Sequence, residues 1–263
     1  MNDMTKYLTD MFSLESKTAI VTGAGGHLCS EMSRTLALAG AHVILVDLRL
    51  KKIQELAAKL NAEGLDNISL YQCDTSKKSY VDQLYVDINK SNGFCDILLN
   101  GAGTNSSTPF FEITESNWDE VYSSQMKSTL FMTQKFAKPM VDNKNGNVIN
   151  ISSASAGPPL SKAFCYSTAK ASILSLTQNL AREFARDNVR VNAIRPGFFP
   201  TEWNIKNFID DERKSAILGH TPQERFGNPN ELSSALLFLL SNASSFVTGT
   251  EVTVDGGFAC MTI

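Results

Sequence analysis

AIVTGAGGHLC, residues 19–29, is the stretch that decides how this chain folds. A short apolar run of the kind found in buried strands ends in a turn, Gly23 to Gly26, in which three of four residues are glycine. The spacing of apolar residues after the turn predicts an amphipathic helix. Glycines allow a tight turn and a close approach to a pyrophosphate, which binds at the N-terminus of the next helix. A plain tight strand-to-helix connection is the alternative, so other residues must decide.

Apolar strand runs and amphipathic helical patterns alternate along the rest of the chain. The expected strands are Ala19–Val21, His42–Val46, Ile68–Tyr71, Ile97–Leu99, Val148–Ile151, Val189–Ile194 and Val252–Val254. The expected helices are Leu28–Ala39, Ile53–Leu60, Val81–Ile88, Asn117–Pro139, Tyr166–Arg186 and Leu232–Leu240. Continuous apolar strands separated by helices indicate a parallel sheet that is covered on both faces.

We therefore expect an α/β fold: a Rossmann-type, doubly wound parallel sheet of about seven strands with helices on both faces. Residues 1–263 are expected to form a single dinucleotide-binding domain. The longest irregular region runs from Pro196 to about Gly227. Because ligands of such sheets bind beyond the carboxyl ends of the strands, residues 196–227 are a candidate substrate lid.

The amino-acid composition argues against several classes of binding partner. The 24 basic residues, against 27 acidic ones, are scattered rather than gathered in a stripe, so we expect no nucleic-acid partner. The five cysteines are dispersed, without CxxC pairs or zinc spacing, and predict reduced thiols, a cytoplasmic location and no metal site. No apolar run is long enough for a bilayer, and the first residues lack the apolar segment of a signal peptide, so we expect no membrane association.

An acidic residue follows the glycine-rich turn at the distance that nucleotide binding requires. Asp47 ends the second expected strand, where a carboxylate can accept hydrogen bonds from both ribose hydroxyls of NAD. Its charge would repel the 2′-phosphate of NADP. The sequence therefore favours NAD, with NADP as the less favoured cofactor, and Arg49 is placed to weaken that preference.

A tyrosine and a lysine four residues apart form the candidate catalytic pair. Tyr166 and Lys170 share one face of a helix, so the phenol and the ammonium project the same way. A nearby ammonium favours the phenolate and is expected to lower the pKa of the phenol, which can then exchange a proton with an alcohol or a ketone. Ser153 ends a strand, and its hydroxyl can hold the substrate oxygen.

In these motifs the chain resembles the short-chain dehydrogenase/reductase family. The resemblance extends over nearly the whole chain through Cys73-Asp74-Thr75, Asn100-Gly101-Ala102-Gly103, Trp118-Asp119-Glu120-Val121, Pro196-Gly197-Phe198-Phe199-Pro200-Thr201 and Val254-Asp255-Gly256-Gly257. Four positions depart from the family pattern. His27 and Cys29 replace glycines, Gly101 replaces a second asparagine, and Gln125 replaces the asparagine that holds a water leading to the lysine.

The resemblance implies an oxidoreductase that interconverts a secondary alcohol and a ketone with NAD or NADP and forms homo-oligomers, either dimers or tetramers. The catalytic residues are expected to be Ser153, Tyr166, Lys170 and Gln125. The residues expected to bind the cofactor are Gly23, Gly25, Gly26, His27, Leu28, Asp47, Asp74, Thr75, Asn100, Ala102, Gly103, Tyr166, Lys170, Pro196, Gly197, Phe199 and Thr201.

The substrate is less well defined than the reaction. Polar or amphipathic candidates for its pocket are Asn105, Lys162, Arg195, Trp203, Asn204, His220 and Arg225. Such a lining suits a sugar, polyol or sugar acid, because hydroxyls need partners. The chain also resembles the sugar and sugar-acid branch of the family, which includes D-mannonate oxidoreductase and gluconate 5-dehydrogenase-like enzymes. A 3-oxoacyl carrier-protein reductase and a nucleotide-binding sensor or scaffold without turnover stay open as alternatives, and Arg195 and Arg225 could equally be surface or interface charges.

Overall fold

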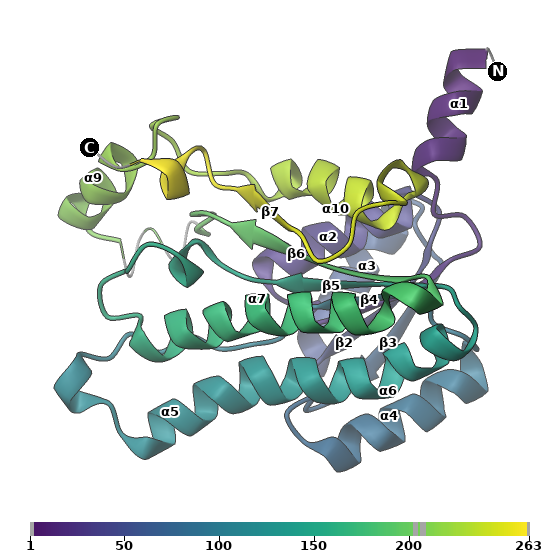
Figure 1. Cartoon of the computed structure of the whole chain (residues 1–263), viewed down its shortest axis with the longest axis horizontal. Coiled ribbons are helices and arrows are strands. Elements are labelled where there is room, and N and C mark those ends of the chain that lie inside the picture. Colours follow the sequence, from purple (N-terminus) through teal and green to yellow (C-terminus); the bar gives the residue numbers. More distant parts are fainter. Residues whose placement is uncertain (1–2, 202–204, 206–208, 262–263) are drawn as a thin grey trace.

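The structure is a computed structural model that describes residues 3–201, 205 and 209–261. A seven-stranded parallel sheet runs through it, in the order β3-β2-β1-β4-β5-β6-β7 (Figure 1). The strands are β1 (Thr18–Thr22), β2 (His42–Asp47), β3 (Ile68–Gln72), β4 (Ile97–Asn100), β5 (Gly146–Ile151), β6 (Val189–Pro196) and β7 (Glu251–Val254). The expected fold class is confirmed, and every strand lies within a few residues of its expected position.

Helices cover both faces of the sheet, as Figure 1 shows. They are α1 (Asp3–Phe12), α2 (His27–Leu38), α3 (Leu50–Ala62), α4 (Lys78–Ser91), α5 (Glu115–Tyr122), α6 (Ser128–Asp142), α7 (Phe164–Phe184), α9 (Asp211–Gly219) and α10 (Ser233–Leu240). Adjacent residues of β1 point to opposite faces: Val21 packs with α2, α3 and α10, whereas Ile20 packs with α4, α6 and α7. Both faces are therefore apolar, which is why the strands are continuous apolar runs.

The strand order creates a switch point beside β1. The chain proceeds outward from β1 to β3 and then crosses back to β4, which pairs with the other side of β1. The connections after β1 and β4 therefore diverge, leaving a crevice beyond the carboxyl ends of these two strands. The glycine-rich turn after Thr22 and the segment after Asn100 form its walls.

The helix expected over residues 117–139 is not continuous. α5 ends at Tyr122, a π-helical turn occupies Ser123–Lys127, and α6 then runs to Asp142, past Pro139. A π turn holds one more residue than an α turn, and it changes the direction in which the flanking side chains point. In this chain it places Gln125 inside the protein, where the residue is 2% exposed.

Two further elements differ from expectation. The region 196–227 contains α9, which is capped by Asp210 through a hydrogen bond from the Arg213 amide (2.7 Å), so this part is less irregular than predicted. Trp203 and Asn204, two substrate-pocket candidates, lie outside the described residues. α1 was not predicted, and it projects from the sheet layers without a buried side chain (Figure 1).

No helix in the part of the chain that the structure describes is long and apolar enough to cross a bilayer. No cluster of three or more His, Cys, Asp or Glu side chains that could hold a metal ion occurs among the same residues.

Candidate active site

A cleft of about 530 Å³ lies beyond the carboxyl ends of β1, β2 and β4. The residues of the cofactor prediction that line it are Gly23, Gly26, His27, Leu28, Asp47, Asp74, Thr75, Ala102, Gly103, Tyr166 and Lys170. Gln125 also lines it, as does Cys29, which was not predicted as a contact. Segments more than 140 residues apart in sequence thus meet in one cavity.

The glycine-rich turn brings the backbone close to the opposite wall of the cleft. Gly23 has a φ of +66°, and a Cβ at this position would lie 2.8 Å from the Cα of Ala102. Only glycine accommodates both the left-handed conformation and this close approach. α2 begins directly after Gly26, and none of the described side chains caps its N-terminus. Its first amide groups are therefore suited to bind an anion.

The carboxylate of Asp47 is held in place by its own neighbours. One oxygen accepts a hydrogen bond from the Gly25 amide (3.0 Å), and the other accepts from the Arg49 amide (2.9 Å) and the Arg49 Nε (3.3 Å). The side chain of Asp47 is 4% exposed, whereas that of Arg49 is 61% exposed. The negative charge is thus a fixed part of the cleft, and the positive charge is on a largely solvated side chain.

Two of the departures from the family pattern contact each other. Gly101 lies against the Cys29 thiol, and a Cβ at this position would overlap with Sγ. A large side chain at one position therefore requires glycine at the other. Burial raises the pKa of the Cys29 thiol to about 12, although the nearby charge of Lys170 acts in the opposite direction. The thiol is consequently neutral and fills space in the floor of the cleft.

Asn100 lies behind the cleft rather than in it. Its Nδ2 donates to Thr133 Oγ1 (3.0 Å) and to Asn150 Oδ1 (2.9 Å), and Asn150 in turn donates to Thr177 Oγ1 (2.9 Å). These buried hydrogen bonds join β4, β5, α6 and α7. The side chain of Asn100 therefore braces the strand ends, and it is not among the residues that line the cavity.

Ser153 and Tyr166 meet at one end of the cleft region. Ser153 follows β5, and its hydroxyl accepts hydrogen bonds from the amide (3.2 Å) and the hydroxyl (3.1 Å) of Ser155. Tyr166 lies in the first turn of α7. Burial raises the pKa of its phenol, and a hydrogen bond with Ser153 acts in the opposite direction. The direction differs from the expected lowering by Lys170, because loss of hydration dominates.

Lys170 lies one turn further along α7 and is 4% exposed. Its Nζ donates to the Ile151 carbonyl (2.7 Å) and lies 5.5 Å from the centre of the Tyr166 ring. Burial lowers the pKa of this amine from 10.5 to about 8. The helix thus presents the phenol and the amine to the same cavity, with the amine tied to the end of β5.

Gln125 extends from the π turn toward the cleft. Its Nε2 donates to the Thr104 carbonyl (2.9 Å), while its Oε1 is buried without a hydrogen-bond partner among the described residues. A methyl group at Gly103 would overlap with this amide. A buried acceptor without a donor is unfavourable, so this oxygen is a site for a water or ligand donor.

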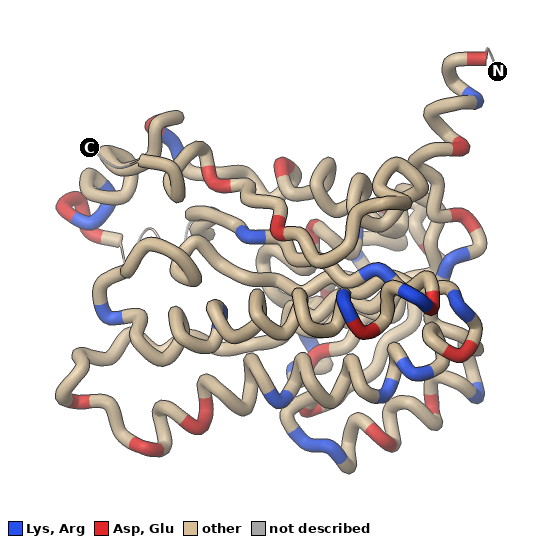
Figure 2. Tube along the Cα trace, in the orientation of Figure 1, with Lys and Arg blue, Asp and Glu red and all other residues tan. Residues whose placement is uncertain are grey.

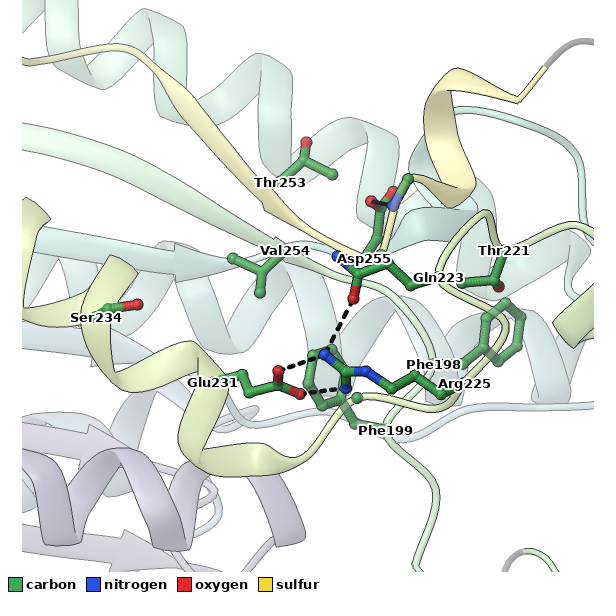
Figure 3. Close-up of a pocket in the computed structure, with 13 residues that line it drawn as sticks. Phe198, Phe199, Thr221, Gln223, Arg225, Glu231, Ser234, Thr253, Val254 and Asp255 are labelled. Atoms are coloured by element: carbon green, nitrogen blue, oxygen red, sulfur yellow. Dashed lines mark hydrogen bonds and ion pairs between the residues drawn. The ribbon is translucent and has the colours of Figure 1, made fainter.

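The loop after β6 faces a different cavity. Gly197 donates its amide to the Val254 carbonyl (2.9 Å), and Phe199 helps to line a second cavity of about 500 Å³ next to β7 (Figure 3). Pro196, Gly197, Phe199 and Thr201, all predicted to bind the cofactor, do not line the first cleft.

Figure 3 also shows the contacts of Arg225, one of the substrate-pocket candidates. Arg225 makes two hydrogen bonds to the Glu231 carboxylate (2.7 and 2.8 Å) and one to Gln223 Oε1 (3.0 Å). Its charge is therefore already paired. His220 is the C-cap of α9, packs against the Phe258 ring in a T-shaped arrangement with the ring centres 4.8 Å apart, and lines a third cavity of about 300 Å³.

Comparisons with known proteins agree with this geometry. A family model described as Enoyl-(Acyl carrier protein) reductase matches residues 25–259. The 5-keto-D-gluconate 5-reductase of Escherichia coli is 33% identical over 95% of this chain and 98% of its own length. A proposed D-mannonate oxidoreductase from Haemophilus influenza, solved with NAD bound, is 35% identical, with a TM-score of 0.89 over 97% of this chain and 99% of that one. Gluconate 5-dehydrogenase from Burkholderia cenocepacia, in complex with NADP and tartrate, is 28% identical, with a TM-score of 0.91 over 97% of this chain and all of that one.

Proposed function

Because this chain belongs to the short-chain dehydrogenase/reductase family, we propose that it interconverts a secondary alcohol and a ketone of a sugar acid with NAD(H). Membership makes it an oxidoreductase that acts on a CH–OH group with NAD or NADP. The sugar-acid class is supported by the relatives, which include a 5-keto-D-gluconate reductase and a gluconate 5-dehydrogenase.

One observation carries the proposal: Tyr166 and Lys170 line the same cleft as the glycine-rich turn. The residues present fit a dinucleotide. The uncapped start of α2 suits the pyrophosphate, the close approach at Gly23 leaves room for it, and the carboxylate of Asp47 suits a ribose. A bound nicotinamide supplies or accepts the hydride.

The protein residues handle the proton and the oxygen. In reduction, the Tyr166 phenol donates its proton to the carbonyl oxygen of the substrate, and in oxidation the phenolate takes it back. The Ser153 hydroxyl donates a hydrogen bond to the same oxygen and stabilises the charge that develops there. The buried amine of Lys170 binds the nicotinamide ribose. The unpaired Oε1 of Gln125 accepts a hydrogen bond from a water that leads to Lys170.

We assign NAD as the preferred cofactor. The fixed carboxylate of Asp47 would hold the ribose of NAD and would repel a 2′-phosphate, and the solvated Arg49 would compensate less than a buried cation. We also propose that the loop with Pro196, Gly197, Phe199 and Thr201 contacts the cofactor where the cofactor extends beyond the cleft, since these residues do not line the cleft itself. A higher kcat/KM with NADPH than with NADH would overturn the cofactor assignment.

A homo-oligomer, dimer or tetramer, is also proposed. Several large apolar side chains on or next to α5, α6 and α7 are exposed, among them Phe111 (98%), Trp118 (40%) and Leu130 (37%). Burying them against a second copy would be favourable. Sedimentation velocity measures the oligomeric state directly, and a monomer at micromolar concentration would refute the assignment.

The test is a panel of 5-keto-D-gluconate, fructuronate, simple polyols and an acetoacetyl thioester, each assayed with NADH or NAD. The proposal expects turnover of a sugar acid, and loss of turnover in Tyr166→Phe while calorimetry shows unchanged NAD binding. Tyr71→Phe, at a phenol hydrogen-bonded to Asn92 (2.7 Å) at the edge of the sheet, is the matched control and should stay active.

The other outcomes of the panel are equally informative. Preference for the thioester would instead indicate a 3-oxoacyl carrier-protein reductase, which would need a basic face to dock an acidic carrier. Figure 2 shows basic and acidic positions interspersed along the trace, which favours the sugar acid. NAD binding without turnover of any compound would indicate a sensor or scaffold.

A further inference from the structure

We propose that the ion pair between Arg195 and Glu251 positions Ser153, so that Arg195 is a positioning residue for the reaction proposed above. This inference rests on that proposed function. From the sequence, Arg195 was a candidate substrate contact or a surface or interface charge; in the structure its side chain is 13% exposed and pairs with Glu251.

Arg195 links two strand ends. It lies near the end of β6, the strand between β5 and β7. Its Nε donates to the main-chain carbonyl of Ser153 (3.2 Å), directly after β5, and its Nη1 donates to Glu251 Oε1 (2.7 Å), at the start of β7. The two side chains are 13% and 22% exposed, so the pair is largely screened from water. A rigid, charged contact therefore runs from β7 to the residue that holds the substrate oxygen.

The guanidinium also supports the loop that orients the Ser153 hydroxyl. A Cβ at Gly157 would overlap with Arg195 Nη2, so the loop lies directly on the guanidinium. Within that loop the Ser155 amide and hydroxyl donate to Ser153 Oγ, and the Ala156 amide donates to the Ser153 carbonyl (2.9 Å). Arg195 thus contacts the main chain of Ser153 directly, and it supports the loop whose Ser155 fixes the Ser153 hydroxyl.

The geometry of the guanidinium explains why residue 195 is arginine and not lysine. A planar guanidinium directs its donors along fixed vectors, so one side chain can reach Ser153, Glu251 and the loop together. A lysine ammonium is a point charge and cannot reproduce these directions. Glu251 Oε2 is buried with no hydrogen-bond partner in the described part of the chain, so Glu251 depends on Arg195 for its compensation.

The experiment compares kcat, KM and NAD affinity of Arg195→Lys and Glu251→Gln with those of the wild type. We expect kcat to fall about 100-fold, the loss typical of a reacting group displaced by about 1 Å. The Kd for NAD, measured by calorimetry, should change less than about twofold, because neither residue lines the cofactor cleft. The matched control is Arg34→Lys. Arg34 lies on α2 and forms an exposed ion pair with Glu63 (2.6 Å), which follows α3.

A second background separates positioning from general structural damage. In Ser153→Ala, the hydroxyl that Arg195 positions is gone, so adding Arg195→Lys should lower kcat by less than about threefold. An equal fall on both backgrounds would show that Arg195 does not act through Ser153, and would overturn the inference. So would crystal structures of the two single variants in which Ser153 Oγ has not moved.

The two proposals fail in distinguishable ways. If the wild type turns over none of the panel compounds, the proposed function fails, and the inference fails with it. If the wild type is active and Arg195→Lys matches it in kcat, only the positioning role is refuted.

Discussion

Replacing Lys170 with methionine should make the free energy of unfolding depend less on pH between about pH 8 and pH 10.5. Burial lowers the pKa of this amine from 10.5 in the unfolded chain to about 8 in the folded protein. Between these values the unfolded chain binds more protons, so the stability of the wild type rises with pH through this window. Below pH 8 the full cost of burying the charge is present, about 3 kcal/mol at pH 7. The hydrogen bond from Nζ to the Ile151 carbonyl offsets part of that cost.

The difference between two pH values isolates the titration from the lost contact. Methionine removes the charge at every pH and also removes the donor to Ile151, which costs about 1–3 kcal/mol throughout. From pH 7 to pH 9.5, the free energy of unfolding of the wild type should therefore rise by about 2 kcal/mol relative to that of Lys170→Met. Other titrating groups are common to both proteins and cancel in the comparison.

Urea unfolding followed by circular dichroism at pH 7, 8, 9 and 9.5 measures this difference, with both proteins at one concentration and without cofactor. A difference between the two proteins that stays constant within about 0.5 kcal/mol would refute the reasoning, because it would mean that Lys170 titrates as it does in water. Activity should be lost in the variant at every pH.

Three further predictions follow from close contacts. Gly101→Asn should destabilise the protein by about 1–3 kcal/mol through overlap with the Cys29 thiol, and Cys29→Gly should recover part of that loss, so thermal unfolding of both single variants and the double variant should be non-additive. Gly103→Ala should displace the Gln125 amide and lower kcat more than it lowers the unfolding temperature; equal kcat in wild type and variant would contradict this. Asn228→Ala removes the cap of the 3₁₀ turn Pro229–Leu232, which leads into α10, and with it the capping box to Glu231; this should cost about 1 kcal/mol in urea unfolding with activity unchanged.

The parts of the fold that could be predicted from sequence are those with a local signal. The five inner strands of the sheet are buried on both faces, and such a strand is a continuous apolar run that can be recognised without neighbours, whereas the edge strands β3 and β7 are only half-buried. Asn228 caps the short 3₁₀ turn Pro229–Leu232 that leads into α10, and such a cap has a local signal because capping residues act within one turn. α1 does carry an apolar period, Met4, Tyr7, Leu8 and Met11, but none of its side chains is buried in the chain, so burial gives this helix no support.

The candidate site was only partly predictable because much of it depends on contacts between distant segments. Asp47, Tyr166 and Lys170 follow from motif spacing, and all three line the cleft. Nothing near Cys29 in the sequence indicates that its thiol meets Gly101. The expected cofactor contact of Asn100 could not be distinguished from a bracing role, because its partner Asn150 lies on a different strand.

The π turn at Ser123–Lys127 has a consequence for how this chain tolerates length changes. Deleting one residue within the turn would let the backbone relax into an unbroken α-helix, with every main-chain hydrogen bond made. The residues of α5 would then rotate by about 100° relative to α6. If the rotation occurred within α5, Trp118 would lose its stacking on Tyr122. Gln125 would leave the cleft wherever the rotation occurred. Frame-preserving deletions there should accordingly yield folded but catalytically silent protein, and insertions or deletions in homologous genes should avoid these five codons.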